Sequence, residues 1–194
     1  AAVAPLLSWK EIKAVLRNRF VFLLGAADAA CFSQYVALTA WLPTFYHETR
    51  DVSLTQAGFI TSLLPFTGIF AVLLGGFLPL KIGPRKLFLI VPGALAALGG
   101  LGSFLFDAPA ITYLAVIVLG VGSWMYVPSL MTLPTEFPDM TPQRVAIVWG
   151  WITTASGAGA FISPLAVGAL KDGTGSYLPG FLIFAVIAWF LVVA

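Results

Sequence analysis

Residues 54–86 read LTQAGFITSLLPFTGIFAVLLGGFLPLKIGPRK, an uncharged apolar segment followed directly by basic residues. A helix needs about 20 apolar residues to cross a hydrocarbon core about 30 Å thick, and the segment from Leu54 to Leu80 is long enough. Lys and Arg directly after such a segment are typical of a helix that ends at a membrane surface. We therefore predict a transmembrane helix followed by a short basic loop.

The rest of the chain repeats this pattern of apolar segments joined by short polar links. Because a lipid-exposed loop would leave backbone amides without hydrogen bonds, segments that cross the membrane are expected to be helices. Short links make consecutive helices antiparallel neighbours. We predict an all-α membrane protein, with a bundle of six transmembrane helices over residues 20–194. The predicted spans are 20–46, 54–80, 86–105, 110–132, 141–170 and 178–194.

The composition of the chain excludes several classes of protein. Of its 194 residues, 60% are hydrophobic and 9% are charged, whereas roughly 25% are charged in soluble domains. A net charge of +2 is too small to neutralise a row of phosphates, so we expect no nucleic-acid partner. The single cysteine cannot form a disulfide within the chain. The expected surroundings are the lipid bilayer.

Basic residues are divided unevenly between the two ends of the predicted spans. Eight lie on one side, and only Arg50 and Lys171 lie on the other. Because cytoplasmic loops carry the excess of Lys and Arg, we expect both ends of the segment in the cytoplasm and the protein in the cytoplasmic (inner) membrane. The eight residues are Lys10, Lys13, Arg17, Arg19, Lys81, Arg85, Lys86 and Arg144.

Residues 1–19 precede the first span and are expected on the cytoplasmic side. Residues 8–19 mix apolar side chains with Lys and Arg, which is typical of an amphipathic helix on a membrane surface. Ser8, followed three residues later by Glu11, predicts a capping box at its start. An ordinary polar linker is the alternative. We interpret both ends of the chain as truncations, because it begins with Ala and stops in an apolar run.

The loop between the second and third predicted spans carries the most informative motif. It runs Gly76-Phe77-Leu78-Pro79-Leu80-Lys81-Ile82-Gly83-Pro84-Arg85-Lys86. This stretch resembles the signature loop of major facilitator superfamily transporters, in which Gly is followed four residues later by Asp, then by a basic residue, Gly and further basic positions. Gly76, Leu78, Lys81, Gly83, Arg85 and Lys86 match, whereas Leu80 replaces the acid and Pro84 a basic residue.

That departure from the family pattern points to one half of such a transporter. The resemblance implies that the missing acid weakens a charge network that locks one conformation, and such degraded motifs are similar to the loop in the C-terminal half. Two further stretches, 42–58 and 163–176, resemble other segments of that half. The resemblance implies half of the family fold, a 3+3 inverted repeat, with the other six-helix half on the same or a separate chain as partner.

Motifs for enzymatic chemistry are missing from the sequence. One His and one Cys cannot supply a conventional zinc site with Cys and His ligands. The sequence has no nucleophile elbow, phosphate-binding loop or dinucleotide-binding glycine motif. We therefore expect no catalytic residue, metal or cofactor, and predict that the protein is not an enzyme.

Asp28 is the one acidic or basic residue well inside a predicted span. An acid near a helix centre costs roughly 2.5–3.5 kcal/mol on insertion, so Asp28 is expected to face a cavity or a partner. On a helical period of about 3.6 residues it shares a face with Phe32, Tyr35 and Thr39. The alternative is a purely structural role in hydrogen bonding or core packing. The candidates for the substrate or proton path are Asp28, Phe32, Tyr35, Thr39, Trp124, Tyr126 and Trp149.

These features predict a secondary active transporter of a small-molecule solute, in which two halves expose a midplane site alternately. Proton coupling through Asp28 is a hypothesis. With no Lys or Arg deep in a span, this half alone fits a neutral or cationic solute better than an anion. One alternative is a non-transporting scaffold or assembly subunit with a plugged cavity. Another, a membrane enzyme, has no nucleophile and base to support it.

Overall fold

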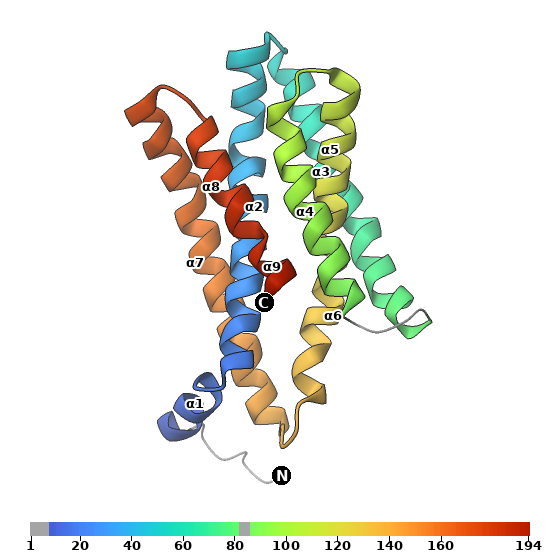
Figure 1. The fold of residues 1–194 in the computed structure, drawn as a ribbon, viewed down its shortest axis with the longest axis vertical. Coiled ribbons are helices and arrows are strands. Elements are labelled where there is room, and N and C mark those ends of the chain that lie inside the picture. The colour runs from blue at the N-terminus through green and yellow to red at the C-terminus, as the bar shows by residue number, and fades with distance from the viewer. Residues whose placement is uncertain (1–7, 82–85) are drawn as a thin grey trace.

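The computed structural model describes residues 8–81 and 86–194, and every regular element in them is a helix (Figure 1). The elements are α1 (Trp9–Leu16), α2 (Arg19–Arg50), α3 (Leu54–Phe77), η1 (Leu78–Leu80), α4 (Leu87–Leu105), α5 (Pro109–Met125), α6 (Val127–Thr132), η2 (Leu133–Glu136), α7 (Pro142–Thr174), α8 (Leu178–Ala188) and α9 (Phe190–Val193). The predicted all-α class is confirmed.

Five helical segments are long and apolar enough to cross a membrane: Arg19–Arg50, Leu54–Leu80, Leu87–Leu105, Pro109–Glu136 and Pro142–Thr174. The last apolar segment, Leu178–Val193, is shorter and is divided at Trp189 between α8 and α9. Five spans and one shorter apolar helix agree with the predicted fold, which is one half of a two-half transporter.

The fourth span is broken at Tyr126, where α5 ends and α6 begins. Pro128 lies in the first turn of α6. Because proline has no backbone N–H, it cannot bond the carbonyl of Trp124, and its ring crowds that carbonyl. The break places Tyr126 at a bend in the middle of the bundle.

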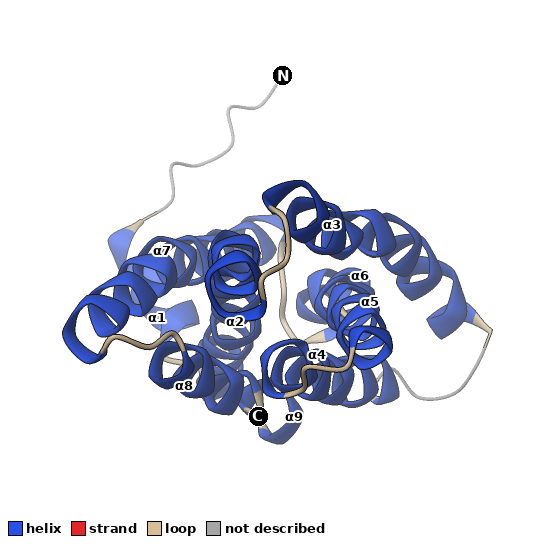
Figure 2. Cartoon of the chain, turned by 90° about the horizontal axis from the view of Figure 1, so that it is seen from above, coloured by secondary structure: helices blue, strands red, loops and turns tan. Residues whose placement is uncertain are grey.

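The packing of the helices follows the pattern of an inverted repeat (Figure 2). The first span, α2, packs most extensively against the fifth, α7, and the fourth, α5, packs extensively against the second, α3. These two contacts correspond when the first three spans are matched in order with the last three. Likewise α2 packs against α8, and α5 packs against α4.

Glycines set the close approach of α4 and α5. A Cβ atom on Gly99 would lie 2.4 Å from the backbone nitrogen of Leu119, and one on Gly122 would lie 2.2 Å from that of Ala96. No side chain fits at such distances, so these positions let the two backbones touch. Contacts of this kind replace the hydrophobic drive, which is missing between helices in lipid.

The two ends of the bundle differ in charge. The lower end in Figure 1 carries α1, the end of α3 and the starts of α4 and α7, and we call it the basic end, because most of the chain's Lys and Arg residues are there. The opposite end carries the turns α2–α3, α4–α5 and α7–α8. The predicted capping box at Ser8 and Glu11 is confirmed at the start of α1. Which end faces the cytoplasm stays a prediction.

Candidate functional site

Asp28 lies in the interior of the bundle, where its side chain joins three spans. The residue is 8% exposed. Its Oδ1 accepts a hydrogen bond of 2.8 Å from the Tyr126 hydroxyl, and its Oδ2 accepts one of 2.5 Å from the Ser156 hydroxyl. Asp28 belongs to α2, Tyr126 to the break between α5 and α6, and Ser156 to α7. The carboxyl group is therefore the point where the first, fourth and fifth spans meet.

Close packing of α2 on α7 brings the short serine side chain within reach. A Cβ on Gly25 of α2 would collide with the indole of Trp151, and one on Gly159 of α7 would collide with the hydroxyl of Ser33. These contacts lie about one turn to either side of the bond between Ser156 and Asp28. Glycine at both levels is what allows the two helices to come together at the site.

The arrangement suits a group that exchanges a proton. Hydroxyl groups can donate or accept hydrogen bonds, so Tyr126 and Ser156 can serve Asp28 as a carboxylate or as a carboxylic acid. A buried carboxylate is costly unless its oxygens are paired. The two hydroxyls reduce that cost without neutralising the charge, because no cation contacts Asp28 among the described residues.

An aromatic cluster adjoins the site on the next turn of α2. The ring centroids of Phe32 and Tyr35 are 6.0 Å apart, and Trp124 meets both rings edge-on at 6.3 and 5.6 Å. The indole nitrogen of Trp124 is buried and has no hydrogen-bond partner among the described residues. The structure thus places Asp28, Phe32, Tyr35, Trp124 and Tyr126 in one region; a shared helical face was predicted for the first three of them, and Trp124 and Tyr126 come from the fourth span.

Two other residues predicted for the substrate or proton path form hydrogen bonds to backbone carbonyls away from Asp28. The Thr39 hydroxyl donates to the carbonyl of Tyr35 at 2.7 Å, within its own helix. Trp149 is 42% exposed, and its indole nitrogen donates to the carbonyl of Met131 at 2.9 Å. Neither residue contacts Asp28, so a role for them in the path stays a prediction.

The residues of the loop motif are only partly within the described chain. Gly76 lies near the end of α3, where a Cβ would meet no atom within 4 Å. Lys81 and Lys86 are exposed at the basic end. Gly83 and Arg85 lie outside the described residues, as does Pro84.

Two buried polar residues of the interior were not among the sequence candidates. Serine occurs often in membrane helices, so nothing in the sequence distinguishes Ser156 from the other serines of the predicted spans. Gln34 is 0% exposed and lies against Gly100 of α4, where a Cβ would sit 1.8 Å from its amide nitrogen. Its amide nitrogen and oxygen have no partner among the described residues.

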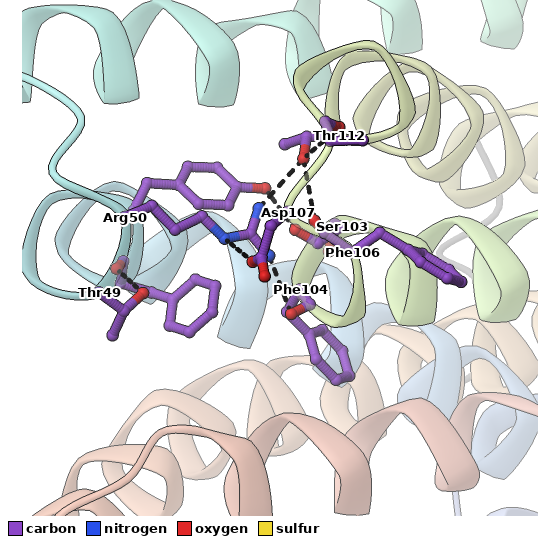
Figure 3. A network of polar contacts seen from close by, with 10 residues as sticks. Thr49, Arg50, Ser103, Phe104, Phe106, Asp107 and Thr112 are labelled. Atoms are coloured by element: carbon purple, nitrogen blue, oxygen red, sulfur yellow. Dashed lines mark hydrogen bonds and ion pairs between the residues drawn. The ribbon is translucent and has the colours of Figure 1, made fainter.

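The end opposite the basic end is held by Arg50 (Figure 3). Its guanidinium donates to the Thr112 hydroxyl and to the Phe104 carbonyl, both at 3.0 Å, and lies 3.2 Å from Asp107 Oδ1. The same group lies over the ring of Tyr46 at 5.1 Å. Because Thr112 lies in the first turn of α5 and Phe104 in the last turn of α4, Arg50 fixes the end of α2 to both helices.

A second polar cluster fixes α2 to α7 and α8. Lys171 Nζ lies 3.3 Å from Glu48 Oε2, and the Tyr177 hydroxyl donates to the same oxygen at 3.0 Å. Burial and the bond to Glu48 raise the pKa of Tyr177, so its hydroxyl keeps the proton that it donates. Both basic residues assigned to this end by the sequence are therefore paired with acids.

The described residues contain no group of three His, Cys, Asp or Glu side chains placed to hold a metal ion. Cys31 is buried within α2, and its thiol adjoins Tyr126.

Comparison with known proteins identifies the family. The sequence model described as Major Facilitator Superfamily matches residues 2–164. The nitrite extrusion protein of Bacillus subtilis is 29% identical over 189 residues, which cover 92% of this chain and 44% of that protein. A probable sulfoacetate transporter of Cupriavidus necator is 32% identical over 158 residues, covering 78% of this chain and 36% of the relative.

A probable nitrate/nitrite antiporter of Thermus thermophilus is 26% identical over 152 residues, covering 69% of this chain and 33% of the relative. The chain spans less than half the length of each of these relatives. The family model covers most of the chain, and the helices have the pairing of an inverted repeat. The chain therefore belongs to the Major Facilitator Superfamily.

Proposed function

We propose that this chain is one half of a secondary active transporter that moves a small solute by alternating access, with proton coupling through Asp28. The observation that carries the proposal is the buried carboxyl group of Asp28, which accepts hydrogen bonds from Tyr126 on the fourth span and Ser156 on the fifth. An ionisable group inside a membrane bundle is costly and is generally retained for a task.

The geometry supports a mechanical role for that proton. Gain or loss of a proton at Asp28 changes which atoms donate and accept in its bonds to Tyr126 and Ser156. Those bonds join spans that belong to different triplets of the repeat. Because Tyr126 sits at the break between α5 and α6, a change in its bond acts where the fourth span is interrupted. Protonation thereby favours one arrangement of the spans over another.

The names of the relatives suggest the substrate class. Three of them are named for nitrite, sulfoacetate and nitrate/nitrite, which are small anions. We propose a small anion as the solute of this protein too. The described residues place Arg50 and Lys171 near one end of the bundle, and the middle of each span contains no Lys or Arg, so in this proposal the counter-charge for an anion comes from the other half of the transporter.

The experiment is solute uptake by the full-length protein in proteoliposomes, with nitrite and sulfoacetate as test solutes and galactose as the neutral control. Uptake is compared with and without an imposed proton gradient for the wild type, Asp28→Asn and Asp172→Asn. Asp172 is an exposed residue of α7 near the end opposite the basic end, so its variant removes the same charge outside the interior.

The proposal predicts that the gradient accelerates anion uptake by the wild type and by Asp172→Asn, and not by Asp28→Asn. Gradient-driven uptake that is unchanged in Asp28→Asn would remove Asp28 from the mechanism. A folded, membrane-inserted protein that transports none of a broad solute panel would favour the non-transporting scaffold, for which a largely sealed Asp28 is also the expected arrangement.

A further inference from the structure

A polar cavity lies at the end of the bundle opposite the basic end. It has a volume of about 510 Å³, within the range of about 300–1,000 Å³ that is usual for small-molecule sites. Its walls come from the end of α2, the α4–α5 turn and the α7–α8 turn, all of them internal to the chain. We call it the α2–α4–α7 cavity. Its nearest lining residue on α2, Phe45, is about 25 Å along the helix from Asp28, so the two regions are separate.

Four charged side chains line the cavity, and they are unequally paired. Lys171 and Glu48 form an ion pair at 3.3 Å, and the Tyr177 hydroxyl donates to the same carboxylate oxygen. The Arg50 side chain is 10% exposed, whereas that of its partner Asp107 is 91% exposed. Figure 3 shows Asp107 beside the guanidinium: Oδ1 lies 3.2 Å from Nε, yet this buried nitrogen has no hydrogen-bond partner among the described residues. Arg50 is thus a largely buried cation with an exposed, weakly bound counter-ion.

The unused part of the guanidinium indicates which ligand the cavity recognises. Nη1 and Nη2 each donate a hydrogen bond to the protein, to the Thr112 hydroxyl and to the Phe104 carbonyl. Nε and the remaining N–H groups stay available, and an arginine fork binds a carboxylate through two parallel hydrogen bonds. Asp107 brings one oxygen to Nε without a hydrogen bond. A free carboxylate in its place can present both oxygens, and displacing Asp107 costs little because exposed ion pairs are weak.

The rest of the cavity suits a ligand with hydroxyl groups. Both contacts to the Glu48 carboxylate use Oε2, so Oε1 can accept a further hydrogen bond. Lys171 has three N–H donors, and its contact with Glu48 takes one of them. Phe45 and Phe104 add apolar ring surface to the lining. A hydroxylated carbon chain therefore meets donors, an acceptor and aromatic rings in this cavity.

We propose that the α2–α4–α7 cavity binds a small hydroxylated carboxylic acid in its anionic form. The carboxylate takes the place of Asp107 on Arg50, and the hydroxyl groups meet Glu48 and Lys171. The cavity is then a second anion site, which collects solute at this end of the bundle and does not involve Asp28. That role in collecting solute rests on the proposed transport function, whereas the binding itself is measured without transport.

The test is binding of gluconate to the purified full-length protein in detergent, measured by isothermal titration calorimetry. Glucose is the control, because it has the same number of carbons and carries hydroxyl groups without the carboxylate. We expect saturable binding of gluconate and none of glucose. Binding of glucose with equal affinity, or no binding of gluconate by the folded protein, would overturn the proposal.

Two acid-to-amide variants locate the binding. Asp107→Asn removes the competing carboxylate and should raise the affinity for gluconate about threefold. Asp172→Asn, which changes an exposed acid outside the cavity lining, should leave the affinity unchanged. Equal affinities of Asp107→Asn and the wild type, or equal gains in the two variants, would contradict the proposal.

A third variant tests the guanidinium itself. Arg50→Lys keeps the charge but loses the planar fork, so it should lower the affinity for gluconate about tenfold. Gluconate binding that is unchanged in folded Arg50→Lys would exclude Arg50 as the carboxylate partner. Asp107→Asn leaves Arg50 in place, so it tests the site even if Arg50→Lys does not fold.

Failure of this site and failure of the transport proposal are distinguishable. If gluconate does not bind while a proton gradient still drives anion uptake, only the second site is wrong. If gluconate binds with the expected response to Asp107→Asn and no solute is taken up, the site is supported and the transport function is not.

Discussion

Replacing Arg50 with Met tests how the end of the bundle opposite the basic end is held together. Methionine keeps an apolar stem that can still pack on Phe45 and Tyr46, but it removes the guanidinium that joins α2 to α4 and α5. The Phe104 carbonyl and the Thr112 hydroxyl each lose a donor at 3.0 Å, and Asp107 loses its ion partner. The matched variant is Asp107→Asn, which removes only the ion pair.

The two variants are expected to differ in size of effect. A hydrogen bond from a charged donor contributes about 1.5–3 kcal/mol, so losing two gives about 3 kcal/mol or more. The Arg50 side chain is 10% exposed, whereas that of Asp107 is 91% exposed. Exposed ion pairs contribute about 0–1 kcal/mol. Arg50→Met is therefore expected to cost at least about 2 kcal/mol more than Asp107→Asn.

The assay is the free energy of unfolding of the purified protein, measured by titration with SDS in mixed micelles. Arg50→Lys is a useful third variant, because it keeps the charge and loses the planar fork that reaches both acceptors. It should fall between the other two. If Asp107→Asn destabilises the protein as much as Arg50→Met does, the ion pair and not the two hydrogen bonds holds this end, and the reasoning is wrong.

Two further predictions concern packing and burial. Gly75→Ala should destabilise the protein by about 1–3 kcal/mol, because its Cβ would lie 2.0 Å from the Met125 carbonyl oxygen. The neighbouring Gly76→Ala should be neutral or slightly stabilising in the same unfolding assay, since its Cβ would meet no atom within 4 Å. Equal effects of the two variants would contradict the close approach of α3 to α5. Cys31 is 0% exposed, so maleimide should not label it in the folded protein but should label it after unfolding in SDS. Mass spectrometry of the peptide that contains Cys31 measures the labelling. Rapid labelling of the folded protein would show that water reaches the region of Asp28.

The spans were predictable because the cost of placing charge in hydrocarbon leaves a strong signal in composition. The same cost singled out Asp28 before its partners were known. Helical periodicity placed Phe32 and Tyr35 with it, and the structure brings both into one aromatic cluster with Trp124.

Periodicity within one helix does not show which face of a neighbouring helix it meets. For that reason Ser156 was not recognised, because its role depends on how α7 packs on α2 at Gly25 and Gly159. Trp149 was selected for its residue type, yet its indole binds the carbonyl of Met131 and not the region of Asp28. The orientation of helices about their axes is a property of tertiary packing.

The break at Tyr126 has a local cause that the sequence contains. Pro128 removes one helical hydrogen bond, and prolines inside membrane helices are common enough that a break does not always follow. Pro43 and Pro65 lie inside continuous helices of this protein, whereas Pro128 lies at the junction of α5 and α6. The presence of a proline alone therefore does not predict where a span breaks.

The most direct test of the account is proton movement during downhill solute efflux from proteoliposomes, followed with a pH-sensitive dye. The account predicts that solute efflux by the wild type moves protons across the membrane, and that Asp28→Asn still exchanges labelled for unlabelled solute but moves none. Proton movement that accompanies solute efflux equally in Asp28→Asn would contradict the claim that the carboxyl group held by Tyr126 and Ser156 carries the proton.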